Sequence, residues 1–234
     1  MTYTEVMQAL EALGREQTKQ IYIRHGAREP LFGVLTGDMK PLAKRIGKNH
    51  DLAMRLYAGG NYDAMYFAGM IAEPDKMTET DLDDWVDKAY CYALADYVVG
   101  TTLAETGFAQ PVADRWIKSG REFVMAAGWT CYCELLVKLR NSNSVRDEQK
   151  IKRMLNRVVE TIHQQPDRTR YSMNNFVIAV GSYYLPLRNE ALAAARTIGK
   201  VHVNMGETAC KVPQATQVIQ KVIAREQQKA RKQA

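Results

Sequence analysis

Residues 89–99, with the sequence AYCYALADYVV, are apolar or aromatic at every position except Asp96. The stretch shows no alternation of apolar and polar residues, so it does not have the pattern of a half-buried strand. It is also shorter than the roughly 20 residues that cross a bilayer. We therefore predict a helix near 89–105 that is apolar around most of its circumference, and such a helix is normally buried inside a protein.

Three further segments, 62–72, 123–139 and 171–185, have the same apolar character, and amphipathic segments such as 147–164 lie between them. Alternation of buried and amphipathic helices is typical of stacked helix pairs that share one core. The pattern predicts an all-α fold, an α-solenoid of about 12–14 helices. A compact helical bundle is the alternative, because no residue pattern repeats at a fixed period. The predicted helices lie near 4–13, 16–25, 38–46, 50–58, 62–73, 80–87, 89–105, 111–119, 121–139, 147–164, 170–184, 188–198 and 214–231.

The composition is that of a globular protein, with 46% hydrophobic and 25% charged residues in a chain of 234. No linker rich in Pro, Gly or Ser divides the chain, so we expect a single domain over 1–234, with a basic tail at 220–234 that adds electrostatic attraction or frays. The four cysteines form no CxxC pair, and the N-terminus has no signal-peptide pattern. We expect a soluble, cytoplasmic protein that does not enter a membrane.

The charge is unevenly distributed along the chain. Residues 51–106 hold three basic and eleven acidic residues, whereas 107–170 hold twelve and seven, and 171–234 hold nine and three. Clustered Lys and Arg favour nucleic acid, because neutralised phosphates release counterions. Solvated helix faces are the alternative explanation.

Sequence motifs for phosphate loops, dinucleotide binding, zinc hydrolases, serine hydrolases and kinases are absent. The histidines are scattered, and no two have the spacing of metal ligands on a helix. We therefore expect neither a metal site nor a cofactor.

Asp96 is the first candidate site residue. A carboxylate in so apolar a helix is either paired or lines a cleft where its charge is used, because bare burial costs several kcal/mol. Tyr92 lies four residues earlier and therefore on the same face. We consider these two as candidate catalytic residues, with a structural hydrogen bond as the alternative for Asp96.

The candidate nucleic-acid-binding residues come from three segments. Trp129 and Tyr132 share one helix face, although such aromatic pairs are usually core. Arg168 and Arg170 stand at a helix start, where the helix dipole disfavours cations, so an anion is expected nearby. Asn174 and Asn175 place amides in an apolar helix, where at least one needs a partner, from the core or from a ligand.

Residues 199–213 are the least regular stretch of the chain. Lys200, Gly206 and Lys211 would suit a turn that meets a phosphate. The alternative is a loop packed through Val201, Val203 and Val212.

The segment 85–96, together with 61–69 and the helices around Gly128 and Met173, resembles the DNA alkylation repair family, with the similarity covering about 15–222. The resemblance implies HEAT-like repeats curved into a concave basic face that cradles duplex DNA. It also implies excision of cationic alkylpurines such as 3-methyladenine and 7-methylguanine by hydrolysis of the N-glycosidic bond.

Several residues that the resemblance implies for activity are replaced in this chain. Of the family's Trp-Asp-x-x-Asp pattern only the last Asp remains, as Asp96, while Tyr92 stands at the Trp position. Tyr132 stands where active members carry an Arg, and Ala179 where they carry a second Trp. The contact between an indole face and a cation contributes about 0.5–2 kcal/mol of binding free energy. The alanine at position 179 cannot make this contact.

We therefore expect a divergent family member that binds duplex DNA or another structured nucleic acid, with base excision weak or lost. The alternative is a helical-repeat scaffold without catalysis that binds a protein or nucleic-acid partner.

Overall fold

The computed structural model describes residues 1–139 and 147–233. Within these residues every regular element is helical, and counting α7, η2 and α8 as one continuous helix there are thirteen helices besides three short 3₁₀ turns. The α-helices are α1 (Tyr3–Leu13), α2 (Glu16–Arg24), α3 (Thr36–Ile46), α4 (His50–Ala58), α5 (Tyr62–Ile71), α6 (Glu79–Lys88), α7 (Tyr92–Leu94), α8 (Thr101–Leu103), α9 (Ala109–Trp116), α10 (Glu122–Leu139), α11 (Glu148–Thr161), α12 (Asp167–Tyr183), α13 (Arg188–Ile198) and α14 (Ala215–Gln233). The 3₁₀ turns are η1 (Pro74–Lys76), η3 (Ile162–Gln164) and η4 (Leu185–Leu187), and η2 (Ala95–Gly100) is a π-helical segment.

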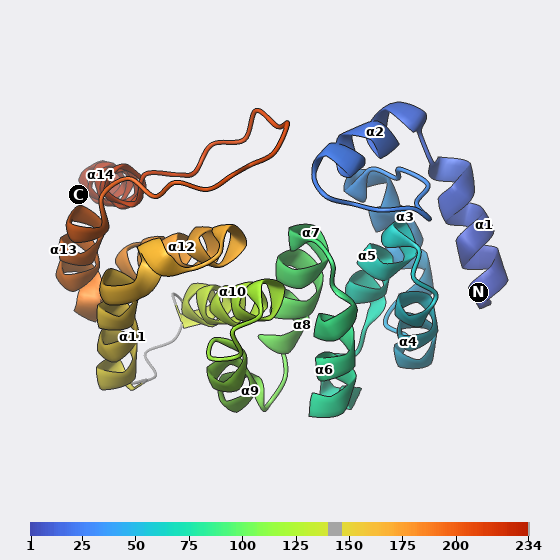
Figure 1. Ribbon diagram of the computed structural model, residues 1–234, viewed down its shortest axis with the longest axis horizontal. Helices are drawn as coiled ribbons and strands as arrows, with labels where there is room; N and C mark the ends of the chain where they lie inside the picture. Colours follow the sequence, from blue (N-terminus) through green and yellow to red (C-terminus); the bar gives the residue numbers. More distant parts are fainter. Residues whose placement is uncertain (140–146, 234) are drawn as a thin grey trace.

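The helices stack in pairs, which confirms the predicted α-solenoid. α4 packs on α5, α6 on η2, α9 on α10, and α11 and α13 on α12. The apolar helices form the inner series, since α5 contacts η2, η2 contacts α10, and α10 packs extensively on α12. Figure 1 shows these pairs following an arc. One cluster of buried side chains extends from Val6 to Ile219, so the pairs share a continuous core.

Side-chain caps begin several of the helices as their sequences predict. Thr2 and Glu5 form a capping box at α1, Asn49 accepts from the backbone N–H of Leu52, and Asn61 accepts from those of Asp63 and Ala64. These bonds satisfy backbone donors that have no partner within the helix. Local sequence therefore sets where these helices start.

The predicted helix over 89–105 is wrong at its start, because Ala89–Cys91 lie outside it. Cys91 is extended, with φ −145° and ψ 164°, and the Tyr90 hydroxyl contacts the backbone of Arg28 instead. The helix begins at Tyr92 and widens into the π-helical segment η2, which contains Asp96. Such segments are rare and often lie at functional sites.

Gly100 allows η2 and α10 to approach closely. A Cβ placed on Gly100 would lie 2.8 Å from the carbonyl oxygen of Ala127 and 3.1 Å from the Cβ of Thr130. Because real Cβ atoms do not come this close to backbone, any larger residue would separate the two inner helices.

Asp63 is a second buried carboxylate, and it fixes the segment before α3. Its oxygens accept from the backbone N–H groups of Phe32, Gly33 and Val34 at 2.6, 3.0 and 2.8 Å. Burial raises the pKa of Asp63, while these three hydrogen bonds lower it. The carboxylate thereby attaches the N-terminal part of the chain to α5.

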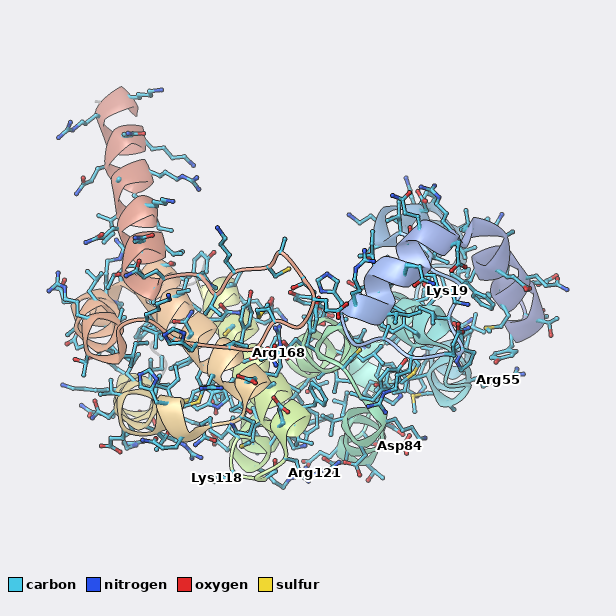
Figure 2. All side chains as sticks on the ribbon, turned by 45° about the horizontal axis from the view of Figure 1, so that its top comes forward. Lys19, Arg55, Asp84, Lys118, Arg121 and Arg168 are labelled. Atoms are coloured by element: carbon cyan, nitrogen blue, oxygen red, sulfur yellow. The ribbon has the colours of Figure 1, made fainter. Side chains whose placement is uncertain are left out.

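The C-terminal helix α14 continues through the basic tail as far as Gln233. Its first turns pack on α12 and α13 through Ala215 and Ile219, and Figure 2 shows its remainder projecting from the body. Among the described residues no helix combines the length and apolarity that a membrane span needs.

Candidate nucleic-acid interface

Asp96 and Arg168 form a buried ion pair that joins η2 to α12. Arg168 Nε donates to Asp96 Oδ2 at 2.7 Å, and one terminal guanidinium nitrogen donates to the same oxygen. The side chains are only 3% and 9% exposed. Asp96 is therefore paired inside the protein. This is the structural role that the sequence analysis gave as the alternative to a catalytic one.

Two tyrosines enclose the Arg168 guanidinium. Its carbon lies 4.3 Å from the centroid of the Tyr92 ring and 4.1 Å from that of Tyr171. Cation–π contacts at such desolvated positions contribute on the order of 2 kcal/mol. The expected common face of Tyr92 and Asp96 is confirmed, because both side chains meet Arg168.

Tyr92 also connects this pair to the N-terminal helices. Its hydroxyl lies 2.7 Å from His25 Nδ1, and burial raises the pKa of Tyr92 to about 12. The phenol therefore keeps its proton at neutral pH, and it donates to Nδ1 or accepts from an Nδ1–H according to which ring nitrogen of the neutral imidazole carries the proton.

Burial raises the pKa of Asp96, and Arg168 is the largest opposing influence. Asp96 Oδ1 and Ser172 Oγ are buried without a hydrogen-bond partner among the described residues. The carboxylate is 2% exposed, so neither water nor a sugar reaches it from the surface in this conformation.

Arg168 and Arg170 were predicted to meet an external anion, and the structure supplies internal ones instead. The helix begins at Asp167 rather than at residue 170, so Arg168 reaches Asp96 and Arg170 pairs with Asp167. Neither guanidinium is exposed enough to serve mainly as a phosphate contact; Arg168 is buried and Arg170 is half-buried.

The prediction that Trp129 and Tyr132 contact nucleic acid is wrong in this conformation. Both lie on one face of α10, as expected, but that face packs on Phe176, with ring centroids 5.1 and 6.3 Å away. Trp129 is 1% exposed and Tyr132 is 5% exposed. The Tyr132 hydroxyl donates to Asp114, so its polar end points toward the outer helix α9.

Asn174 anchors a loop rather than presenting an amide to solvent. Its Nδ2 donates to the carbonyl of Pro213 at 2.9 Å, and the residue is 1% exposed. Asn175 is half-buried on α12, and Ala179 is buried on the same helix. The core interpretation therefore holds for Asn174.

The stretch from 199 to 214, which we call the 199–214 loop, connects α13 to α14. Figure 1 shows it reaching across the open side of the arc toward the segment after α2. Its base packs through Val201, which is buried, with Val203 and Val212 against the core. Lys200 and Lys211 are exposed, and neither forms an ion pair with another described residue. These two lysines remain candidate phosphate contacts.

Sequence reasoning missed the residues opposite this loop. Arg24 and Arg28, at the end of α2, line a cleft of about 550 Å³ together with the starts of α7, α10 and α12. The short basic segment Arg24–Arg28 after a helix was the available signal. Within 1–139 and 147–233, no three His, Cys, Asp or Glu side chains gather as metal ligands would.

The described residues form an α-solenoid with a buried aspartate on one of its inner helices. The comparisons with known proteins agree with this class of fold. The family model described as DNA alkylation repair enzyme matches residues 6–227. The chain belongs to this family.

Relatives extend over nearly the whole chain. Uncharacterized proteins of Listeria innocua and Listeria monocytogenes are each 32% identical over 226 residues, covering 94% of this chain and 97% of theirs. A solved structure is 51% identical with a TM-score of 0.88, covering 97% of this chain and 95% of its own. It is described as a new family related to the HEAT-like repeat DNA glycosylases with affinity for branched DNA structures. The expected HEAT-like repeats are thereby confirmed.

Proposed function

We propose that this protein binds branched DNA along the concave side of its arc and that it excises alkylated bases weakly or not at all. The observation that carries the loss of excision is the buried Asp96–Arg168 pair. A glycosylase carboxylate must stabilise positive charge that develops on the sugar or position water. Here the cation that neutralises Asp96 is Arg168, which two tyrosine rings already enclose.

The other positions of the family site support the loss of excision. Tyr132 points to the outer helices and Ala179 is buried, so neither presents an indole or a guanidinium to a lesion. Binding is supported by exposed cations on both sides of the open arc, Arg24 and Arg28 on one side and Lys200 and Lys211 on the other. The proposed preference for branches is supported by the description of the 51% identical structure, which has affinity for branched DNA structures.

Fluorescence anisotropy with labelled DNA tests the binding. We expect a three-way junction to bind at least about tenfold more tightly than a linear duplex of the same length and composition, a difference of about 1.4 kcal/mol. Binding should weaken steeply with salt. Equal affinity for both DNAs would contradict the branch preference, and a shallow salt dependence would favour the alternative of a protein partner.

A second measurement tests the chemistry. Duplexes that contain 7-methylguanine or 3-methyladenine are incubated with the protein, and free base is quantified beside Asp96→Asn. We expect no release above this control. Multiple-turnover release that is lost in a folded Asp96→Asn variant would overturn the loss of excision and would show that the ion pair opens during catalysis.

A further inference from the structure

The cleft between the end of α2 and the 199–214 loop has the size of a small-ligand site. Its volume of about 550 Å³ lies within the roughly 300–1000 Å³ of such sites. The loop closes one side, because Asn204 N donates to Asp167 Oδ1 at 3.1 Å. At the tip of the loop, a Cβ placed on Gly206 would lie 3.7 Å from the carbonyl of Arg24.

The charged groups of the cleft leave a surplus of positive charge. Of its two carboxylates, Asp167 pairs with Arg170 and also accepts from the loop, whereas Glu122 accepts from the backbone N–H of Arg168 and keeps its negative charge. Arg168 is neutralised by Asp96. Arg24 and Arg28 are exposed and have no carboxylate partner among the described residues.

Helix ends add to this positive field. The continuous helix that begins at Tyr92, α10 and α12 all start at the cleft. Helix N-termini favour anions, and phosphate is a common occupant. The electrostatics therefore point to a ligand that carries at least one phosphate.

The remaining wall is aromatic. Phe123, Tyr90 and Tyr92 are half-buried and line the cleft. The Arg28 guanidinium lies 5.3 Å from the centroid of the Tyr90 ring, so a cation and a ring are presented together. Aromatic faces beside arginine are how proteins hold unpaired bases, whereas paired bases in a duplex keep their faces covered.

We propose that this cleft binds an unpaired nucleotide of a DNA strand at a branch point, with its base against the aromatic wall around Phe123 and its phosphate on Arg24 and Arg28. The proposal rests on the branched-DNA binding proposed above and adds a site for the nucleotide that leaves the helical stack. The proposal gives the cleft between α2 and the loop a binding role that does not require access to the buried carboxylate of Asp96.

The test uses the full chain and two three-way junctions, one fully paired and one with two unpaired nucleotides at the branch, one of them 2-aminopurine. We expect the second junction to bind about tenfold more tightly, as stacking of a base on an aromatic side chain permits. We also expect the 2-aminopurine fluorescence to fall when the protein binds.

Four variants separate the cleft from the rest of the surface. Phe123→Leu keeps apolar volume without a ring and should lose both the preference and the quenching, while Phe123→Tyr should keep them. Arg28→Ala should weaken binding of the unpaired junction more than that of the paired one. Lys118→Ala is the control for charge, because Lys118 is exposed at the edge of the molecule away from the loop (Figure 2).

The outcomes distinguish this inference from the function on which it rests. Tight binding of both junctions without preference or quenching would overturn the nucleotide site alone. Failure to bind any junction would overturn both proposals. Deoxyadenosine monophosphate that binds as tightly as the unpaired junction would assign the cleft to a free nucleotide and overturn its assignment to a DNA strand.

Discussion

At the scale of single residues, the ion pair between Asp96 and Arg168 joins side chains 72 positions apart in the sequence. Each charge is buried, and each compensates the other. A buried pair is often no more stable than apolar residues of similar volume, but removal of one partner leaves an uncompensated charge. The pair therefore specifies how η2 and α12 meet rather than simply adding stability.

Arg168→Ala should lower the free energy of unfolding by about 3–5 kcal/mol, because it leaves the Asp96 carboxylate buried without its cation. Urea denaturation followed by circular dichroism measures the change. Arg121→Ala is the control, since its pair with Asp87 is exposed and should cost less than about 1 kcal/mol. Similar losses for the two variants would contradict the assigned role of the buried pair.

Tyr92 makes the free energy of unfolding depend on pH in the alkaline range. Its pKa is about 12 in the folded protein because of burial, whereas an unfolded tyrosine ionises near 10. The folded state holds the proton longer, so its contribution is complete below pH 10 and is lost as the pH rises to 12. Denaturation at stepwise pH should show a smaller loss in Tyr92→Phe; an identical loss would place the effect in other tyrosines.

At the scale of elements, close contact between η2 and α10 depends on the absence of a side chain at Gly100. Gly100→Ala should destabilise the fold by about 1–3 kcal/mol, because the added Cβ meets the Ala127 carbonyl. The matched control is Gly37→Ala in α3, where nothing lies within 4 Å of the new Cβ. There the higher helix propensity of alanine should stabilise by up to about 1 kcal/mol. The melting temperatures of both variants, measured by thermal unfolding, test this prediction. Equal shifts in the two melting temperatures would contradict the close contact between η2 and α10.

At the scale of the whole molecule, the projecting half of α14 adds positive charge outside the arc. Arg225, Lys229 and Lys232 are exposed on it without an ion pair to another described residue. Replacing all three with alanine should reduce the slope of log affinity against log salt by up to about 0.9 for each phosphate that these side chains neutralise. The branch preference should persist. Titrations at several salt concentrations test this, and an unchanged slope would mean that α14 does not bind DNA.

The sequence by itself determined the helices and their alternation. Apolar segments around 62–72, 123–139 and 171–185, with local caps such as Asn49 and Asn61, depend on neighbours close in the chain, so periodicity and spacing were sufficient to place them. The resemblance indicated the family for the same reason, because its motifs are local.

Only the tertiary structure decided what the candidate site residues do. Whether Asp96 was free or paired depended on Arg168, and whether Trp129 faced DNA or Phe176 depended on how α10 lies on α12. The start of the helix at Tyr92 depended on contacts between Tyr90 and Arg28. The cleft likewise needs α2 and the 199–214 loop to meet. Contacts between residues far apart in the chain leave no periodic pattern in a single sequence, so the site could not be predicted from it. The helices could be predicted, because their patterns and caps are local.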